Sequence, residues 1–167
     1  MSERKFNVLF LCTHNSARSV MAEALLNVLG RENFHAFSAG SMPSGRVNPF
    51  ALEKAAAIGF DTSAVRSKSW DEFAAPGAPH MDIVITVCDN AAGEVCPIWP
   101  GHPATAHWGF PDPSTTAGSD DEKRHAFKQV FFAIRRRIEL LVNLPVDKLK
   151  RLALANELKR IHADSTT

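Results

Sequence analysis

The chain begins with a strand that runs directly into a polar loop and then into a helix. Residues 6–11 are almost entirely apolar, and residues 12–17 are mostly small or polar. Apolar side chains then recur every four positions, which predicts a helix over 18–29 that ends before Gly30. This order of elements favours an α/β fold with a loop at the carboxyl end of its first strand, where such folds bind ligands.

The same alternation continues along the rest of the chain. Strands are predicted over residues 34–39, 81–87 and 105–108, and helices over 49–59, 120–142 and 146–161. Because crossover connections are right-handed, we expect a three-layer α/β sandwich: a four-stranded parallel sheet of flavodoxin-like order 2-1-3-4 with helices on both faces. Residues 1–144 would form this single domain, and residues 145–167 a helical extension packed on it or at an interface.

Composition excludes several classes of protein. The 167 residues carry 19 basic and 18 acidic side chains, a balance that argues against nucleic acid as a partner. No apolar run approaches the roughly 20 residues of a membrane span, and the first residues lack the features of a signal peptide, so a cytoplasmic protein is expected. In that compartment three cysteines are not a disulfide framework. They are inert core residues, metal ligands or redox groups.

The loop after the first strand has the composition of an anion site. From Cys12 to Ser19 the sequence reads Cys, five residues, Arg, Ser, where a strand ends and a helix begins. Backbone N–H groups and the helix dipole favour negative charge there, which also favours a Cys12 thiolate with Ser19 placed to donate a hydrogen bond to it. Arg18 can donate two parallel hydrogen bonds to a tetrahedral anion. The residues expected to bind the oxyanion are Thr13, His14, Asn15, Ser16, Ala17, Arg18 and Ser19.

Residues 8–24, which include this loop, resemble the signature of the low-molecular-weight protein tyrosine phosphatase family. Within that family the chain is most similar to the arsenate reductases that share the fold. Supporting segments are Phe37–Gly40, Val47–Pro49, Thr86–Cys88, Cys96–Pro97 and His107–Pro113, so that the resemblance spans residues 6–143. It implies an enzyme in which the Cys12 thiolate is the nucleophile and Arg18 holds arsenate, phosphate or sulfate.

The resemblance also implies a general acid, Asp112, which precedes Pro113 in a loop after the last strand. A carboxylic acid at this place speeds the departure of an oxygen leaving group by protonating it. In the phosphatases of the family, tyrosines after this Asp-Pro pair flank the aromatic ring of the substrate, whereas this chain has Ser114 and Thr115 there and no tyrosine at all. A small inorganic oxyanion is therefore the expected substrate, although Trp108 and Phe110 lie nearby in the sequence.

The family resemblance implies a thiol relay for the other two cysteines. After Cys12 attacks arsenate, Cys88 attacks Cys12 and releases arsenite, and Cys96 then attacks Cys88 to form a disulfide that an external thiol reduces. A zinc site is disfavoured by the spacing of the cysteines, and an inert core position is an alternative for Cys88. No tightly bound cofactor is implied. Thioredoxin is the expected reductant, but Cys88 and Cys96 are one residue further apart than in the thioredoxin-coupled relatives and Ala17 replaces a loop cysteine, so glutathione with glutaredoxin, or mycothiol, stays open.

Three further expectations concern residues around this site. Some family members bind potassium beside the anion loop, and the matching positions are Asn15, Glu23 and Ser38, without a commitment to a metal here. The run Arg135–Arg137 is expected on the solvated face of a helix. Two other functions stay open for the loop: a phosphatase for phosphotyrosine or aryl phosphates, and a partner protein that binds oxyanions without turnover.

Overall fold

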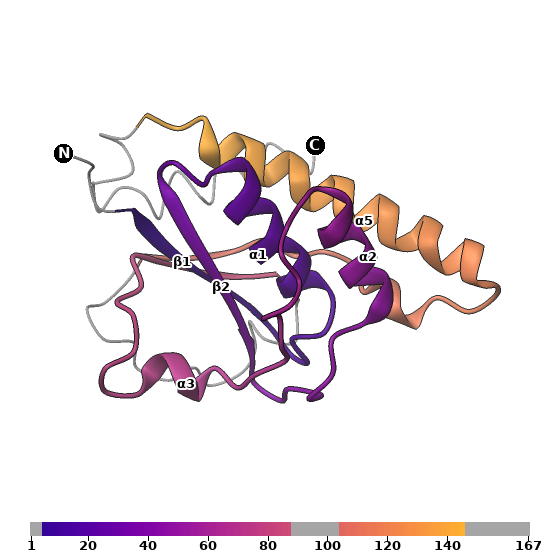
Figure 1. Ribbon diagram of the computed structural model, residues 1–167, viewed down its shortest axis with the longest axis horizontal. Coiled ribbons are helices and arrows are strands. Elements are labelled where there is room, and N and C mark those ends of the chain that lie inside the picture. The colour runs from indigo at the N-terminus through magenta and orange to yellow at the C-terminus, as the bar shows by residue number, and fades with distance from the viewer. Residues whose placement is uncertain (1–4, 88–103, 146–167) are drawn as a thin grey trace.

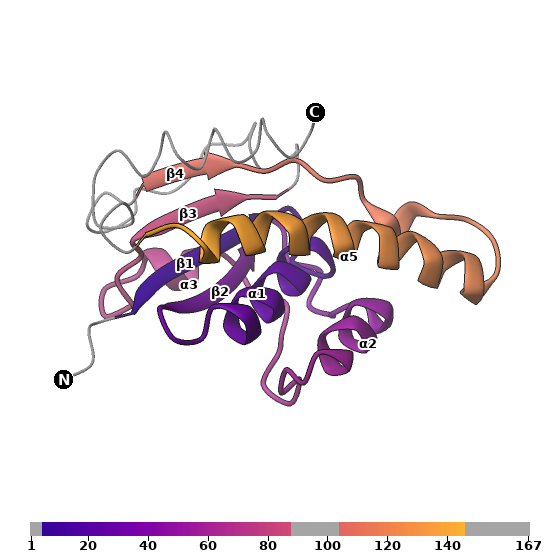
Figure 2. The same ribbon diagram turned by 90° about the horizontal axis from the view of Figure 1, so that it is seen from above.

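The core of the fold is a parallel sheet of four strands, as the sequence predicts. The computed structural model describes residues 5–87 and 104–145. Strand β1 (Phe6–Cys12) lies between β2 (Phe34–Gly40) and β3 (Ile83–Thr86), and β4 (Ala104–His107) pairs with β3. The order β2-β1-β3-β4 and the parallel pairing confirm the predicted topology (Figure 2).

Helices cover both faces of this sheet. The structure has the helices α1 (Arg18–Leu29), α2 (Pro49–Ala57), α3 (Asp71–Ala74) and α5 (Asp120–Val142) and the short 3-10 helix η1 (Pro113–Thr115). Figure 1 shows α1, α2 and α5 on one side of the strands and α3 on the other. The side chains of β1 alternate accordingly: Val8 and Phe10 pack into the core under α1 and α5, whereas Leu9 and Leu11 pack against Phe73 of α3.

The helix ends follow from local sequence. Asn48 begins α2 by accepting a hydrogen bond from the Phe50 N–H at 2.9 Å, and the Ser119 hydroxyl begins α5 by accepting one from the Glu122 N–H at 3.2 Å. The predicted ranges of these helices and of α1 hold within one or two residues. The third strand is shorter than predicted: its register pairs with β1 and β4 cover residues 83–86, and Met81 and Val87 are buried just beyond its two ends.

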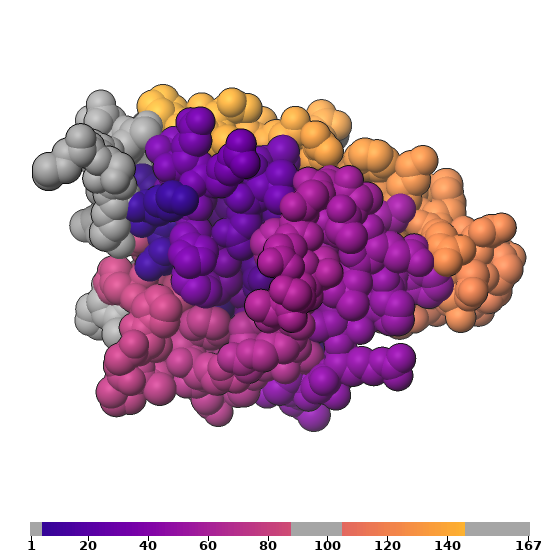
Figure 3. Space-filling model, viewed as in Figure 1, coloured from indigo at the N-terminus to yellow at the C-terminus, as the bar shows by residue number. Residues whose placement is uncertain are grey.

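The space-filling view shows how these parts form the surface. Helix α5, coloured orange to yellow, makes the upper edge of the molecule, and violet residues that follow β2 make the lower right edge (Figure 3). Within residues 5–87 and 104–145, no helix is both long and apolar enough to cross a bilayer. The predicted helix over 146–161 and the cysteines Cys88 and Cys96 lie outside the described residues.

Candidate active site

The anion loop lies at the carboxyl end of β1, where the sheet packs it against the end of β2. Cys12 is the last residue of β1, pairs in register with Gly40, and is only 4% exposed. A Cβ atom on Gly40 would lie 2.5 Å from the Thr13 carbonyl oxygen and 2.9 Å from the Cys12 carbonyl oxygen. Glycine at position 40 therefore allows the loop to pass directly over the neighbouring strand.

Hydrogen bonds from the segment after β2 fix the direction of the loop carbonyls. The carbonyl oxygens of Thr13, His14 and Ser16 accept hydrogen bonds of 2.8, 3.0 and 2.8 Å from backbone N–H groups within residues 42–48. No described peptide bond is cis. Because a trans peptide points its N–H opposite to its C=O, the N–H groups that follow these carbonyls point away from residues 42–48. The loop thus presents several amides to one side, as binding of an oxyanion requires.

Asn15 holds the turn of this loop from inside. Its φ of 49° is the one positive value among the described residues other than glycine, and its side chain is fully buried. The amide Nδ2 donates to the Ser19 hydroxyl at 2.8 Å, and Oδ1 accepts from the Lys68 N–H at 2.9 Å. Asparagine tolerates the left-handed backbone better than most residues, and these two bonds keep it there. They also leave the Ser19 hydroxyl proton available to the loop.

Arg18 joins the anion loop to the loop that carries Asp112. Its Nη1 donates to the Phe110 carbonyl oxygen at 2.9 Å, and its Nη2 lies 3.5 Å from Oδ2 of Asp112. The other carboxylate oxygen of Asp112 accepts from the N–H and hydroxyl of Ser114 at 2.9 and 2.6 Å, which caps η1 and fixes the carboxylate. Asp112 remains about one-third exposed, so a leaving group can reach it. The structure thus brings together three of the residues expected to be catalytic, since Cys12 and Arg18 lie at the two ends of the anion loop.

The last described residues before Cys88 lie beside the end of β1. Thr86 pairs in register with Leu11, and the Val87 N–H donates to the Leu11 carbonyl oxygen at 2.9 Å. Cys12 and Cys88 are the next residues after this hydrogen-bonded pair. Of the five residues expected to be catalytic, Cys88 and Cys96 lie outside the described part of the chain.

The aromatic residues near Asp112 are buried. Trp108 is 0% and Phe110 is 4% exposed, and Trp108 packs against Phe10 with ring centroids 6.3 Å apart. Neither ring can therefore flank a substrate in the solvent-facing part of the site. Ser114 and Thr115, which follow the acid, offer hydroxyl groups only.

The prediction that residues 135–137 form a solvated face is wrong for Arg137. This side chain is 5% exposed, its guanidinium lies 4.2 Å above the ring of Phe110, and its Nη1 donates to the Gly109 carbonyl oxygen at 3.3 Å. Sequence reasoning missed its contact with residues 108–116, which we call the acid loop because this segment carries Asp112, since a run of three arginines is usually solvated. The periodic spacing from Val130 through Ile134 and Leu141 places position 137 on the buried face of α5 and could have revealed it.

A second charged pair, Glu23 and Lys68, lies next to the anion loop. The two side chains are 13% and 10% exposed, and Nζ of Lys68 lies 4.0 Å from Oε1 of Glu23, which also accepts from the Ser38 hydroxyl at 2.6 Å. Burial raises the pKa of the Glu23 carboxyl, against the opposing effects of Ser38 and Lys68. Burial likewise lowers the pKa of the Lys68 ammonium, against the attraction of Glu23.

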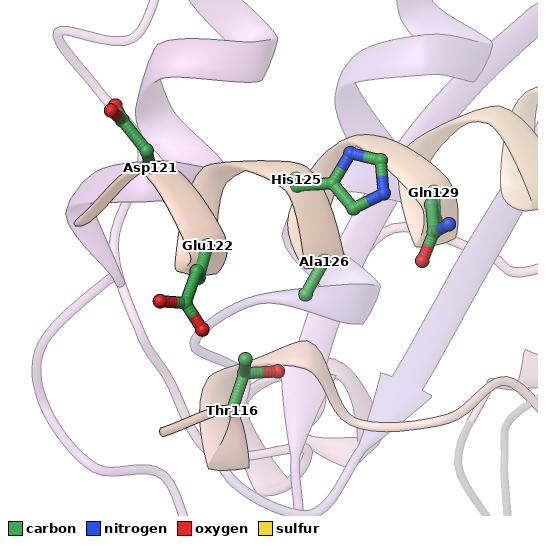
Figure 4. Close-up of a pocket in the computed structure, with 6 residues that line it drawn as sticks. All are labelled: Thr116, Asp121, Glu122, His125, Ala126 and Gln129. Atoms are coloured by element: carbon green, nitrogen blue, oxygen red, sulfur yellow. The ribbon is translucent and has the colours of Figure 1, made fainter. Parts of the chain in front are cut away.

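Two open hollows border the site. One of about 440 Å³ is formed beside the anion loop by Ser16 and residues 44 and 46–49. The other, of about 490 Å³, lies between the end of the acid loop at Thr116 and the first turns of α5, where Glu122 and His125 face it (Figure 4). Because no residue of the anion loop lines the second hollow, we place the reacting anion in the loop and not there.

The sequence profile of the low molecular weight phosphotyrosine protein phosphatases matches residues 7–155 of the chain. The chain belongs to this family. The match includes the anion loop, Arg18 and Asp112, and it extends past the last described residue. The family match over most of the chain therefore confirms the family that residues 8–24 resemble.

Relatives within the low molecular weight phosphotyrosine protein phosphatase family include proteins named for another reaction. An arsenate reductase of Halalkalibacterium halodurans is 39% identical over 132 residues, which cover 79% of this chain and 91% of that protein. A solved arsenate reductase in its phosphate binding state is 28% identical with a TM-score of 0.63, over 82% of this chain and 96% of that one. The thioredoxin-dependent arsenate reductase Cg_ArsC1' of Corynebacterium glutamicum is 26% identical with a TM-score of 0.55, over 84% of this chain and 65% of that one.

Proposed function

We propose that this protein is an arsenate reductase, an oxidoreductase that converts arsenate to arsenite through a cysteine relay. The observation that carries the proposal is the hydrogen bond from Val87 to Leu11, because it places the residues just before Cys88 and Cys12 side by side at the carboxyl ends of two neighbouring strands. A phosphatase has no use for a second cysteine there, whereas a reductase requires one. The names of the relatives support the same reaction.

In the first step, the Cys12 thiolate attacks the arsenic of bound arsenate. The loop amides and Arg18 hold the arsenate oxygens and stabilise the charge that develops on them. One oxygen leaves as water after protonation, for which Asp112 is the acid we propose, and a bond between Cys12 sulfur and As(V) remains. At this stage arsenic has not yet been reduced.

In the second step, the Cys88 thiolate attacks the sulfur of Cys12. A disulfide forms, the sulfur–arsenic bond breaks, and its electron pair leaves with arsenic, which becomes As(III) and departs as arsenite. Cys96 then attacks Cys88, which frees Cys12 as a thiolate and moves the disulfide to the pair Cys88–Cys96. The thiols of Cys88 and Cys96 supply the two electrons, so the oxidised enzyme needs two electrons from an external thiol reductant for each turnover.

Thioredoxin is the reductant we propose, since one relative with the same fold is thioredoxin-dependent. Glutathione with glutaredoxin, or mycothiol, is the alternative reductant, because Cys88 and Cys96 are one residue further apart than in the thioredoxin-coupled relatives. Each of these thiols is kept reduced in the cytoplasm, where we place the enzyme.

The experiment that tests the proposed function compares two substrates on one preparation. Arsenite production from arsenate is measured with thioredoxin, thioredoxin reductase and NADPH, and hydrolysis of p-nitrophenyl phosphate is measured in parallel. We expect kcat/KM for arsenate to exceed that for the aryl phosphate by orders of magnitude, and Cys12→Ser to abolish both activities. Faster hydrolysis of the aryl phosphate, with Cys88→Ser as active as wild type, would identify a phosphatase. Binding of phosphate without either activity would identify a protein that only binds oxyanions.

A further inference from the structure

Lys68 is anchored to the anion loop through its backbone, and its ammonium group is largely buried beside Glu23. Its N–H donates to the Asn15 side chain at 2.9 Å, and its carbonyl oxygen accepts from the Gly40 N–H at 2.9 Å. The residue therefore bridges the inside of the loop and the end of β2. Two backbone hydrogen bonds fix where the side chain of Lys68 starts.

The side chain of Lys68 ends beside a buried carboxylate. Its Nζ donates to the Arg66 carbonyl oxygen at 3.1 Å and lies 4.0 Å from Oε1 of Glu23. Glu23 is on α1, five residues after Arg18, which is a helix rise of about 7.5 Å. Without a cation at this place, Glu23 would set a negative charge within ~10 Å of an anion that the loop must bind.

The three positions expected for potassium do not offer a site for a metal ion. Oδ1 of Asn15 is used by the Lys68 N–H, and Ser38 donates its hydroxyl to Glu23. The carboxylate of Glu23 already has the Lys68 ammonium beside it. A hard cation needs several oxygen ligands at once, and these residues do not supply them.

We propose that the Lys68 ammonium is the built-in cation of the anion loop, balancing Glu23 in place of a metal ion, so that oxyanion binding depends on Lys68 and is independent of potassium. Lys68 is a positioning residue and does not contact the anion. Its charge cancels that of Glu23, and its backbone holds Asn15 and so the loop turn. The inference rests on the proposed binding of oxyanions by residues 12–19.

The test is the binding of inorganic phosphate to the reduced protein by titration calorimetry, in potassium, sodium or tetramethylammonium chloride at one ionic strength. For wild type we expect the same Kd in all three salts. Lys68→Met should weaken binding about tenfold, the size of one uncompensated charge acting over roughly 10 Å at an effective dielectric constant near 20. In Glu23→Gln/Lys68→Met most of the affinity should return, because the uncompensated charge is gone.

Two further variants sharpen the test. Lys68→Ala leaves space beside Glu23, so potassium chloride should restore phosphate binding that tetramethylammonium chloride does not. Lys5→Met removes one exposed lysine at the opposite end of β1 and should leave Kd unchanged. Near-ultraviolet circular dichroism checks that each variant is folded. If Lys68→Met does not fold, Glu23→Gln alone carries the test, since it should bind phosphate at least as tightly as wild type.

Three results would overturn the inference: wild-type affinity that rises several-fold in potassium, Lys68→Met that binds like wild type, or Glu23→Gln that binds more weakly. Wild type that binds no phosphate in any salt would instead contradict the proposed function. The two failures are therefore distinguishable in the same set of titrations.

Discussion

Arg18 contacts both halves of the site: Nη2 lies 3.5 Å from Oδ2 of Asp112, while Nη1 donates to the Phe110 carbonyl oxygen at 2.9 Å. One guanidinium thus couples the loop that binds the anion to the loop that carries the acid. When an oxyanion enters, the same planar group has further N–H donors to offer. The function of Arg18 therefore depends on the planar arrangement of its N–H donors as well as on its positive charge.

Arg18→Lys should therefore keep the charge and lose most of the activity. Lysine cannot donate to Phe110, approach Asp112 and bind two anion oxygens at once. We expect arsenate turnover to fall by about 10²–10³, the usual effect of removing one donor to a developing oxyanion. The matched control is Arg46→Lys, an exposed arginine next to the 440 Å³ hollow, which should leave kcat within twofold. Equal losses in both variants would contradict the special role of Arg18.

Asp112→Asn tests the acid while preserving its cap. Asparagine can still accept from the Ser114 N–H, so η1 should persist. Without a proton to donate, kcat should fall by roughly 10²–10⁴. Asp61→Asn is the control, because Asp61 accepts from the Ser63 N–H in the same way, at 3.0 Å, on an unrelated loop. A wild-type kcat in Asp112→Asn would show that another group supplies the proton.

Arg137→Met should remove the support that α5 gives to the acid loop. It removes the hydrogen bond to Gly109 and the stacking on Phe110 while keeping most of the buried volume. We expect the free energy of unfolding to fall by about 1–3 kcal/mol and kcat to fall more than phosphate affinity. Arg136→Met, in an exposed position of the same helix, should change neither quantity. A stable variant with normal kcat would show that the acid loop does not need this support.

Glu23 should make the stability of the protein depend on pH. Burial raises its pKa above the ordinary 4.5, so the folded state binds this proton more tightly than the unfolded state does. The stabilisation is complete below the unfolded pKa and is lost as pH rises through the folded pKa. Relative to Glu23→Gln, wild type should lose free energy of unfolding as the pH rises above the ordinary pKa of 4.5, as measured by urea denaturation. A gain over that range would contradict the buried position of Glu23.

Local signals in the sequence were sufficient for most of the fold. Capping side chains at Asn48 and Ser119 located the starts of α2 and α5, and the apolar strands with right-handed crossovers led to the sheet order. Helix α3 was not predicted, because a single turn is too short for hydrophobic periodicity to appear. The position of the anion loop also followed from sequence, since a loop between a strand and a helix is a local feature.

The supports of the site were not predictable in the same way. Lys68 and Arg137 reach the site from distant parts of the chain. Nothing in its local sequence distinguishes Lys68 from a solvated charge, and the burial of Arg137 shows only in the spacing of apolar residues along α5. The same holds for residues 42–48, whose N–H groups orient the loop carbonyls. Such contacts depend on how the elements pack, which short patterns do not encode.

The most direct test of the relay is to map the disulfide that forms in one turnover. Reduced protein is mixed with one equivalent of arsenate without reductant, quenched with a thiol-blocking reagent, digested and analysed by mass spectrometry. Wild type should yield one arsenite and a Cys88–Cys96 disulfide, and Cys96→Ser should stop at Cys12–Cys88. Release of arsenite by Cys88→Ser at the wild-type rate, or a wild-type protein in which Cys88 remains a thiol after arsenite has been released, would contradict the account.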